Sequence, residues 1–139
     1  MTGAKITAAQ LRRIKKAIDT VPFAQLLGIE LDTISSGTAT LGLNVRKQLR
    51  QNHGMVHGGA IASLIDTATA FAIISLLAPS ERVTTVDLTV SYLRPLTEGR
   101  LTAVARVLRS GRRLFVVSAE VFDKDGKLAT TALSTYIKL

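Results

Sequence analysis

Amide side chains, both histidines, three glycines and one carboxylate lie within sixteen consecutive positions of this chain. The segment begins at Gln51, passes a His-Gly-Gly run and reaches Asp66, the only charged residue between positions 60 and 78. A carboxylate is costly to bury without a reason, and a glycine-rich helix start carries unpaired backbone N–H groups. The combination predicts a catalytic site rather than a packing device.

Asp66 and the glycines match two requirements of attack on a carbonyl carbon. The carboxylate would act as general base or nucleophile, and the N–H groups of Gly58 and Gly59 would form an oxyanion hole. The structural alternatives are an acid capped by neighbouring hydroxyls and glycines that only close a turn. Seven residues separate Gly59 from Asp66, which is roughly 10 Å along a helix. One carbonyl cannot easily approach both groups, so we expect a site assembled from two chains.

The composition is that of a folded, basic chain without cysteine. Its 139 residues, 47% hydrophobic, predict one domain over residues 1–139, with apolar surface left for another subunit. Lack of cysteine excludes disulfides and thiolate zinc sites, and we expect no metal and no bound cofactor. The net charge of +8 favours an anionic partner. Few aromatic residues and no recognisable motif argue against nucleic acid.

Hydrophobic periodicity places the predicted site between a helical start and a run of strands. The N-terminus has no signal-peptide pattern, so we expect a cytoplasmic protein with no membrane segment. One long helix should begin at Gly58 or Gly59 and end before Pro79. The other expected elements are an N-terminal helical extension within residues 1–22 with Thr7 as N-cap, a short helix 22–27 stopped by Gly28, and strands 29–35, 38–45, 82–93, 100–109, 114–123 and 128–138.

The spacing of the motifs from Gln51 onward resembles that of the hotdog-fold thioesterases, specifically their PaaI-like branch. The matching features are Gln51, Gly54, His57-Gly58-Gly59 and Asp66, the strand 83–88 followed by Tyr92-Leu93-Arg94-Pro95, and the turn 123–127. The resemblance covers roughly residues 23–139. It implies an α+β hotdog fold, a curved antiparallel sheet wrapped around one long central helix. It also implies subunits that pair through their sheets, as a dimer or a dimer of dimers (a homotetramer), with two sites per dimer.

The resemblance also implies roles for individual side chains. Asp66 would activate water or attack directly, and Gln51 would orient the thioester or the water with its amide. His57 would donate near the carbonyl or brace the loop, and Thr85 would position Asp66 or hold the water. Without the resemblance, Gln51 reads equally well as the source of a loop hydrogen bond, and a lone histidine in a glycine turn, such as His57, is more often structural.

An acyl-CoA substrate is expected to follow a path across strand ends and turns. Arginines at such places suit phosphate groups, although most surface cations have no dedicated ligand. The resemblance places the substrate-binding candidates Tyr92, Arg94, Ser110, Gly111 and Arg112 along the coenzyme path. Gly59, at the helix start, is the remaining substrate-binding candidate.

Several functions stay open at this point. The first is an acyl-CoA thioesterase acting on an aromatic acyl group, of the phenylacetyl or hydroxybenzoyl type, or on a short to medium chain. A non-catalytic acyl-CoA-binding hotdog protein and an acyl carrier protein thioesterase are the alternatives. Asp66 argues against the non-catalytic binding protein, which would not need a buried acid there. A hotdog dehydratase is less favoured because His57 lies before the helix, at the thioesterase position, and a basic nucleic-acid or membrane-surface module is the least favoured.

Overall fold

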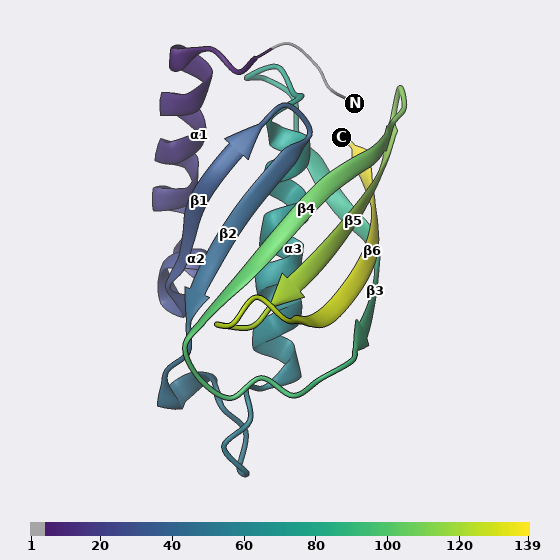
Figure 1. Cartoon of the computed structure of the whole chain (residues 1–139). Coiled ribbons are helices and arrows are strands. Elements are labelled where there is room, and N and C mark those ends of the chain that lie inside the picture. Colours follow the sequence, from purple (N-terminus) through teal and green to yellow (C-terminus); the bar gives the residue numbers. More distant parts are fainter. Residues whose placement is uncertain (1–4) are drawn as a thin grey trace.

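The computed structural model describes residues 5–139, so the first four residues of the expected N-terminal extension lie outside the described residues. Three α-helices, one short 3-10 helix and six strands follow one another as the sequence predicts, with the 3-10 turn as an addition (Figure 1). Their bounds are α1 Ala8–Thr20, α2 Pro22–Leu27, β1 Ile29–Ser35, β2 Thr38–Asn44, η1 Lys47–Leu49, α3 Gly58–Ile74, β3 Val83–Tyr92, β4 Arg100–Ser110, β5 Leu114–Phe122 and β6 Leu128–Lys138.

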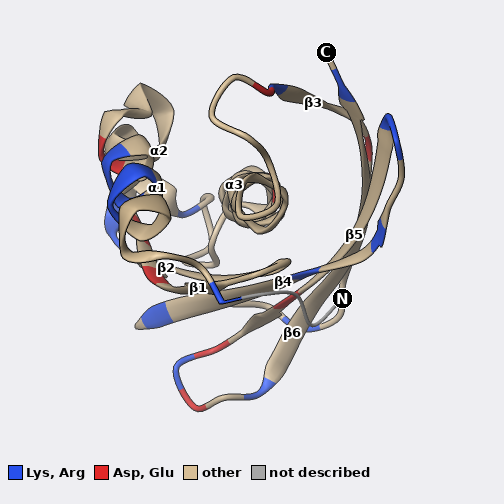
Figure 2. Cartoon of the chain, turned by 90° about the horizontal axis from the view of Figure 1, so that it is seen from above, with Lys and Arg blue, Asp and Glu red and all other residues tan. Residues whose placement is uncertain are grey.

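The six strands form one antiparallel sheet in the order β1-β2-β4-β5-β6-β3. Viewed from above, this sheet curls around α3, while α1 and α2 lie beside β1 and β2 (Figure 2). The predicted α+β hotdog arrangement of a curved sheet around one central helix is confirmed. Because β3 is the edge strand of the sheet, no described strand covers α3 on the side between β3 and α1.

Local signals explain the first two helices. Thr7 caps α1 as predicted: its hydroxyl accepts the N–H of Gln10, whose side chain accepts the N–H of Thr7 in return. Gly28 ends α2 with a φ of 79°, in the left-handed region where a side chain is strained. Ile14 and Ile18, both buried, fix α1 on the rest of the fold.

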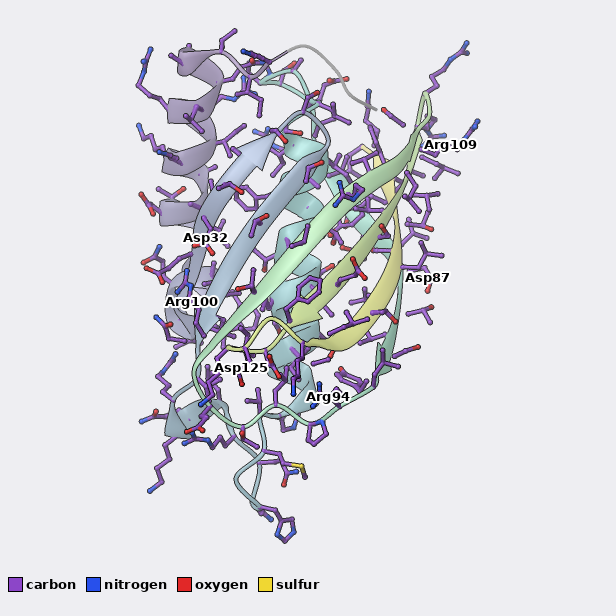
Figure 3. The ribbon with its side chains drawn as sticks, in the orientation of Figure 1. Asp32, Asp87, Arg94, Arg100, Arg109 and Asp125 are labelled. Carbon is purple, nitrogen blue, oxygen red and sulfur yellow. The ribbon has the colours of Figure 1, made fainter. Side chains whose placement is uncertain are left out.

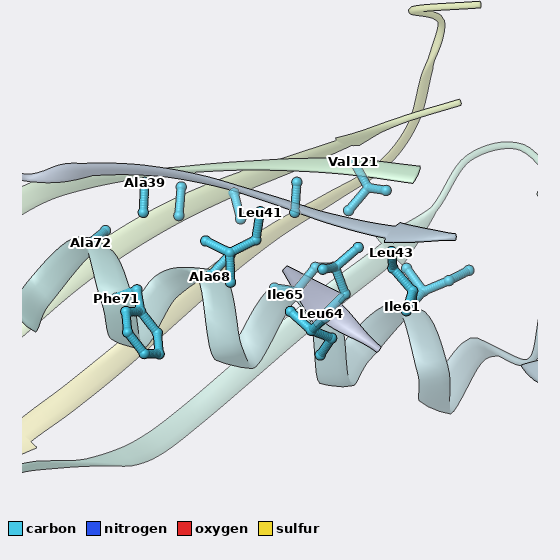
Figure 4. Packing of buried hydrophobic residues seen from close by; sticks show 14 of the residues in the cluster. Ala39, Leu41, Leu43, Ile61, Leu64, Ile65, Ala68, Phe71, Ala72 and Val121 are labelled. Atoms are coloured by element: carbon cyan, nitrogen blue, oxygen red, sulfur yellow. The ribbon is translucent and has the colours of Figure 1, made fainter. Parts of the chain in front are cut away.

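Helix α3 is the centre of the hydrophobic core. Leu64, Ile65, Ala68 and Ala72 are fully buried, and they face small and branched residues of the sheet (Figure 4). These sheet residues include Ala39, Leu41, Leu43, Ala103, Ala105 and Val121, each with 0% exposure. Alanines on the sheet allow the helix to approach closely, and complete burial of its apolar side chains stabilises the pair by roughly 2 kcal/mol per large side chain.

The predicted end of the long helix is wrong by four residues. The helix stops at Ile74 rather than running to Pro79. Ser75 ends it, because its hydroxyl donates to the carbonyl of Ala72 at 2.7 Å and accepts the N–H of Gly37 at 2.7 Å. Residues 76 and 77 then form tighter turns. The hydrogen bond from Gly37, 38 residues away in the sequence, contributes to this boundary, and the residues around Ser75 do not reveal it.

Within the described residues, no helix has both the length and the apolar character needed to cross a membrane.

Gly28→Ala should lower the free energy of unfolding by about 1 kcal/mol, because alanine is strained at this positive φ. The added Cβ would also lie 3.4 Å from the guanidinium of Arg46, which donates to the carbonyls of Leu26 and Leu27. Urea denaturation of the variant measures the loss. An unchanged midpoint would contradict the prediction.

Candidate active site

Asp66 lies on a face of α3 that the sheet leaves half-buried, in a row with Ala62, Ala70 and Ile74. Its carboxylate oxygen Oδ1 accepts a hydrogen bond from the Thr85 hydroxyl at 2.8 Å and lies 3.1 Å from the phenol oxygen of Tyr136. The carboxyl group opens into a cavity of about 290 Å³, which we call the Asp66 cavity. Phe23, Ala62, Ser63, Thr67, Thr85 and Leu88 line it with Asp66.

The register of the sheet brings Thr85 to Asp66. Thr85 of β3 pairs with Tyr136 of β6, so both hydroxyl groups lie on the inner face opposite α3. The register shifts directly after this pair, between Thr85 and Asp87, as in a β-bulge. Thr85 therefore lies beside Asp66 as predicted, whereas a catalytic role for Thr85 stays a prediction.

Tyr136 is a site residue that the sequence did not indicate. Its phenol donates to the backbone carbonyl of Asp66 at 2.7 Å and contacts the Thr69 hydroxyl at 2.9 Å. Burial raises the pKa of Tyr136 to about 12, so the group stays a neutral hydrogen-bond donor at ordinary pH. The only signal was the alternation of strand 128–138, which places Tyr136 inward without saying which helix residue it meets.

A second cavity of about 250 Å³, the Gly58 cavity, gathers four other predicted residues: Gln51, Gly58, Tyr92 and Arg94. The Tyr92 hydroxyl donates to the carbonyl of Gly58 at 2.7 Å. A Cβ on Gly58 would lie 3.3 Å from this ring, so glycine permits the close approach. No described residue accepts the N–H of Gly58, which is among the unpaired donors at the start of α3.

The prediction that Gly59 offers a second free N–H group is wrong. His57 is the N-cap of α3, and its Nδ1 accepts the N–H of Gly59 at 2.8 Å. His57 is therefore built into the helix start as an acceptor. The local spacing was visible in the sequence, but caps are usually Ser, Thr, Asp or Asn, so a histidine cap was not expected.

Gln51 braces its own loop and also reaches the Gly58 cavity. Its Oε1 accepts the N–H of His53 at 3.0 Å, which is the structural role considered for it above. No described residue accepts from its side-chain nitrogen, so that end of the amide is free to donate.

Ser110, Gly111 and Arg112 lie at the turn between β4 and β5. Within one chain this turn does not lie beside the other predicted site residues. Arg109, next to this turn, and Arg94 lie at opposite ends of the sheet (Figure 3). Gly111 donates to the carbonyl of Leu114 at 2.8 Å, and a Cβ there would meet the same oxygen at 2.9 Å. Their role along a coenzyme path remains a prediction.

Within one chain the candidate residues therefore form two half-sites. Eight residues of α3 separate Gly58 from Asp66, or roughly 12 Å of helix. The two cavities share no lining residue. Another cavity, of about 770 Å³ between α1, α2 and the β1–β2 ribbon, contains none of the catalytic or substrate-binding candidates named above.

Known proteins share this fold and this segment. A family model described as the thioesterase superfamily matches residues 53–130. The chain is 32% identical over 132 residues to the medium/long-chain acyl-CoA thioesterase YigI of Salmonella typhimurium, covering 84% of this chain and 85% of that protein. It is 35% identical over 106 residues to the acyl-coenzyme A thioesterase PaaI of Escherichia coli, covering 75% and 73%.

Solved structures agree with the sequence comparison. The structure of the E. coli PaaI protein superposes with a TM-score of 0.88 at 25% identity, covering 96% of each chain. The chain therefore belongs to the thioesterase superfamily, and within it is PaaI-like. It is a thioester hydrolase.

Tyr136→Phe should change how stability depends on alkaline pH. The folded pKa of about 12 lies above the ordinary 10.0, so the contribution of Tyr136 is present below pH 10.0 and is lost as pH rises through about 12. The loss is up to about 2 kcal/mol. Urea denaturation of both proteins at about pH 9 and pH 11.5 measures it. Lysines also titrate in this pH range, but they do so in both proteins and cancel from the difference in free energy of unfolding. A difference that stays constant with pH would therefore contradict the prediction.

Proposed function

We propose that this enzyme hydrolyses acyl-CoA thioesters at a site shared by two subunits. The observation that carries the proposal is a carboxylate on a buried helix, fixed by two hydroxyl groups at the edge of a cavity. Relatives named acyl-CoA thioesterases support the substrate class. Coenzyme A enters as part of the substrate and leaves as a product, and the proposal requires no separate cofactor. Such a substrate is consistent with action in the cytoplasm.

Asp66 acts as the general base in this proposal. Its carboxylate removes a proton from a water molecule while the water oxygen attacks the thioester carbon. The carbonyl oxygen becomes an oxyanion, and re-formation of the carbonyl breaks the C–S bond. The proton on Asp66 passes to the leaving thiolate, so the products are the free acid and coenzyme A.

The hydrogen bonds at Asp66 make its two oxygens unequal. Oδ1 is engaged by Thr85 and Tyr136, whereas no described residue donates to Oδ2. The occupied oxygen fixes the plane of the carboxyl group, and the other keeps its lone pairs for water. This asymmetry favours the positioning role for Thr85 over the water-holding role.

The edge strand β3 is the surface that suits a second copy of the chain. It is ten residues long, pairs only with β6 among the described strands, and exposes most of its residues. A long open edge of this kind is normally covered or paired. Pairing of β3 with the β3 of another subunit would continue the sheet across a two-fold axis.

Such a pairing would complete the site. Antiparallel pairing about the middle of Val83–Tyr92 would set the partner's Tyr92 beside Val83 and Thr85. Tyr92 is bonded to Gly58, so the Gly58 cavity of one subunit would face the Asp66 cavity of the other. The free N–H of Gly58 and the side-chain nitrogen of Gln51 would then supply the oxyanion hole.

The same pairing would gather positive charge for coenzyme A phosphates. Val83 pairs with Lys138, whose N–H donates to the carbonyl of Arg113, so the β4–β5 turn lies at this end of β3. Arg112 in this turn and the partner's Arg94 would approach the same region. Exposed leucines on the outer face of the sheet, Leu108, Leu114 and Leu133, offer a second contact for a dimer of dimers.

Asp66→Asn should lower kcat for acyl-CoA hydrolysis by about 10²–10⁴-fold, because the amide cannot accept the proton. Its side-chain oxygen can still accept from Thr85, and Tyr136 still donates to the backbone carbonyl at this position, so the fold should persist. Steady-state hydrolysis with thiol detection measures the effect, and circular dichroism and light scattering serve as controls. A folded variant with full activity would remove Asp66 from the mechanism.

A single turnover in H₂¹⁸O with enzyme in excess distinguishes base from nucleophile. The base route places ¹⁸O in the product acid. A nucleophilic Asp66 would form a mixed anhydride, and its opening by water at the Asp66 carbonyl would give unlabelled acid and labelled protein, a result that excludes the base route.

Two inactive variants should restore activity when mixed, if the site is shared. Gly58→Pro removes the N–H donor at the first helical position, where proline is tolerated, and should lower kcat by about 10²–10³-fold. Gly58→Ala is its control, because it keeps the N–H and adds a Cβ against Tyr92 in the same way. Mixed dimers of Gly58→Pro and Asp66→Ala each contain one intact site, so equal co-expression should restore roughly a quarter of the activity. No restoration, with mixed dimers verified by affinity tags, would place the whole site in one chain.

A further inference from the structure

A third cavity continues the Asp66 cavity toward the end of α3. This α1 cavity has a volume of about 300 Å³ and lies between α1, the end of α3 and the start of β3. Its apolar lining includes Ala17, Ala70, Ile74, Leu77 and Val83. None of these residues was singled out in the sequence.

The two cavities share no lining residue but follow one another along the same helix and strand, and together we call them the trough. On α3, Asp66 lines the first cavity and Ala70 the second, one helical turn apart on the same face. On β3, Thr85 lines the first and Val83 the second, two residues apart and therefore on the same side of the strand. The N-terminal helices form a third wall: Phe23 of α2 lines the Asp66 cavity, and Ala17 of α1 lines the α1 cavity.

We infer that this trough holds the acyl chain of the substrate, with α1 as its outer wall, and that the enzyme selects straight chains of medium length. The inference rests on the function proposed above. Phe23 is 53% exposed in the free chain although it is a large apolar side chain beside Asp66. An acyl chain in the trough would cover it.

The length of the trough sets the length of the chain. Ile74 lies eight residues beyond Asp66, or roughly 12 Å along the helix. An extended hydrocarbon advances roughly 1.3 Å per carbon, from C–C bonds of about 1.5 Å. The apolar walls therefore accommodate about eight to ten carbons. A flat aromatic acyl group would fill only the part nearest Asp66.

The far end of the trough is polar and closes the apolar region. Arg13, Glu81 and Arg82 line the α1 cavity there. Arg13 donates to the carbonyl of Leu77 at 3.3 Å, and Glu81 is bound to Lys138 at 2.7 Å. Extending a methyl end into these groups would desolvate charges without replacing their hydrogen bonds, so longer chains gain nothing from the additional carbons.

The wall formed by α1 is held firmly enough to define a shape. Ile14 and Ile18 of α1 are 1% and 4% exposed, whereas Ala17, between them on the helix, is half-buried at the trough. Because the side chain of Ala17 is small, the trough stays open at this point. A larger side chain at position 17 or 70 should shorten it.

The test is hydrolysis of a series of acyl-CoA esters from butyryl to hexadecanoyl, with phenylacetyl-CoA included. Wild type should have its highest kcat/KM near octanoyl or decanoyl. Ala70→Leu and Ala17→Leu should each lower kcat/KM for decanoyl-CoA by about tenfold or more, and leave butyryl-CoA within about twofold. Ala9→Leu, on the exposed side of α1, is the matched control and should leave the whole profile unchanged.

The outcomes separate this inference from the proposed function. An active wild type whose profile is unchanged in Ala70→Leu and Ala17→Leu would overturn the trough and leave the thioesterase proposal intact. A clear preference for phenylacetyl-CoA would do the same. A wild type inactive on every ester would refute the proposed function. Calorimetric binding of decanoic acid, which requires no turnover, would then test the trough: binding weakened by Ala70→Leu but not by Ala9→Leu supports it, and equal binding overturns it.

Discussion

A helix that is apolar on nearly all sides must be covered on all sides, and one chain does not achieve this for α3. Six strands curl around the helix and stop at β3, which leaves the row Ala62, Asp66, Ala70 and Ile74 half-buried. The carboxylate, the cavities on either side of it and the open edge of β3 all lie along this seam. The same incomplete closure that creates space for a substrate therefore also creates the surface that requires a second subunit.

A carboxylate at such a place needs polar partners that do not neutralise it. The Thr85 hydroxyl donates to one carboxylate oxygen, the phenol of Tyr136 lies beside the same oxygen and donates to the backbone carbonyl of Asp66, and neither group carries a charge at ordinary pH. A lysine or arginine in their place would form an ion pair and make the carboxylate a poorer base. Neutral donors hold the geometry of the carboxylate without pairing it with a fixed positive charge, which suits proton transfer from water.

The sequence was informative wherever a feature is decided by neighbours along the chain. The order of the elements, the Thr7 cap, the stop at Gly28 and the spacing from Gln51 to Asp66 are all local patterns. It was uninformative where a contact spans the fold. Tyr136 meets Asp66 across 70 positions, and this pairing depends on strand order and register.

Side-chain contacts explain the two predictions that were wrong, the end of α3 and the free N–H of Gly59. The end of α3 is set by the bond from Gly37 to Ser75, which joins two loops that no periodicity connects. The N–H of Gly59 is lost to a histidine cap, and propensities rank histidine low at that position. In both cases a side-chain hydrogen bond changes what the backbone pattern alone predicts, and such bonds depend on three-dimensional context.

The histidine cap also determines what kind of oxyanion hole the chain offers. His57 engages Gly59, and the carbonyl of His57 accepts the N–H groups of Ala60 and Ile61, so the first turn of α3 retains only the Gly58 donor. A single backbone donor stabilises an oxyanion less than two do. The side-chain nitrogen of Gln51 lines the same cavity and has no acceptor among the described residues, as is also true of the Arg94 guanidinium, which the proposal assigns to the coenzyme phosphates. In the proposed site the amide at position 51 is thus the second half of the oxyanion hole, made necessary by the way His57 begins the helix.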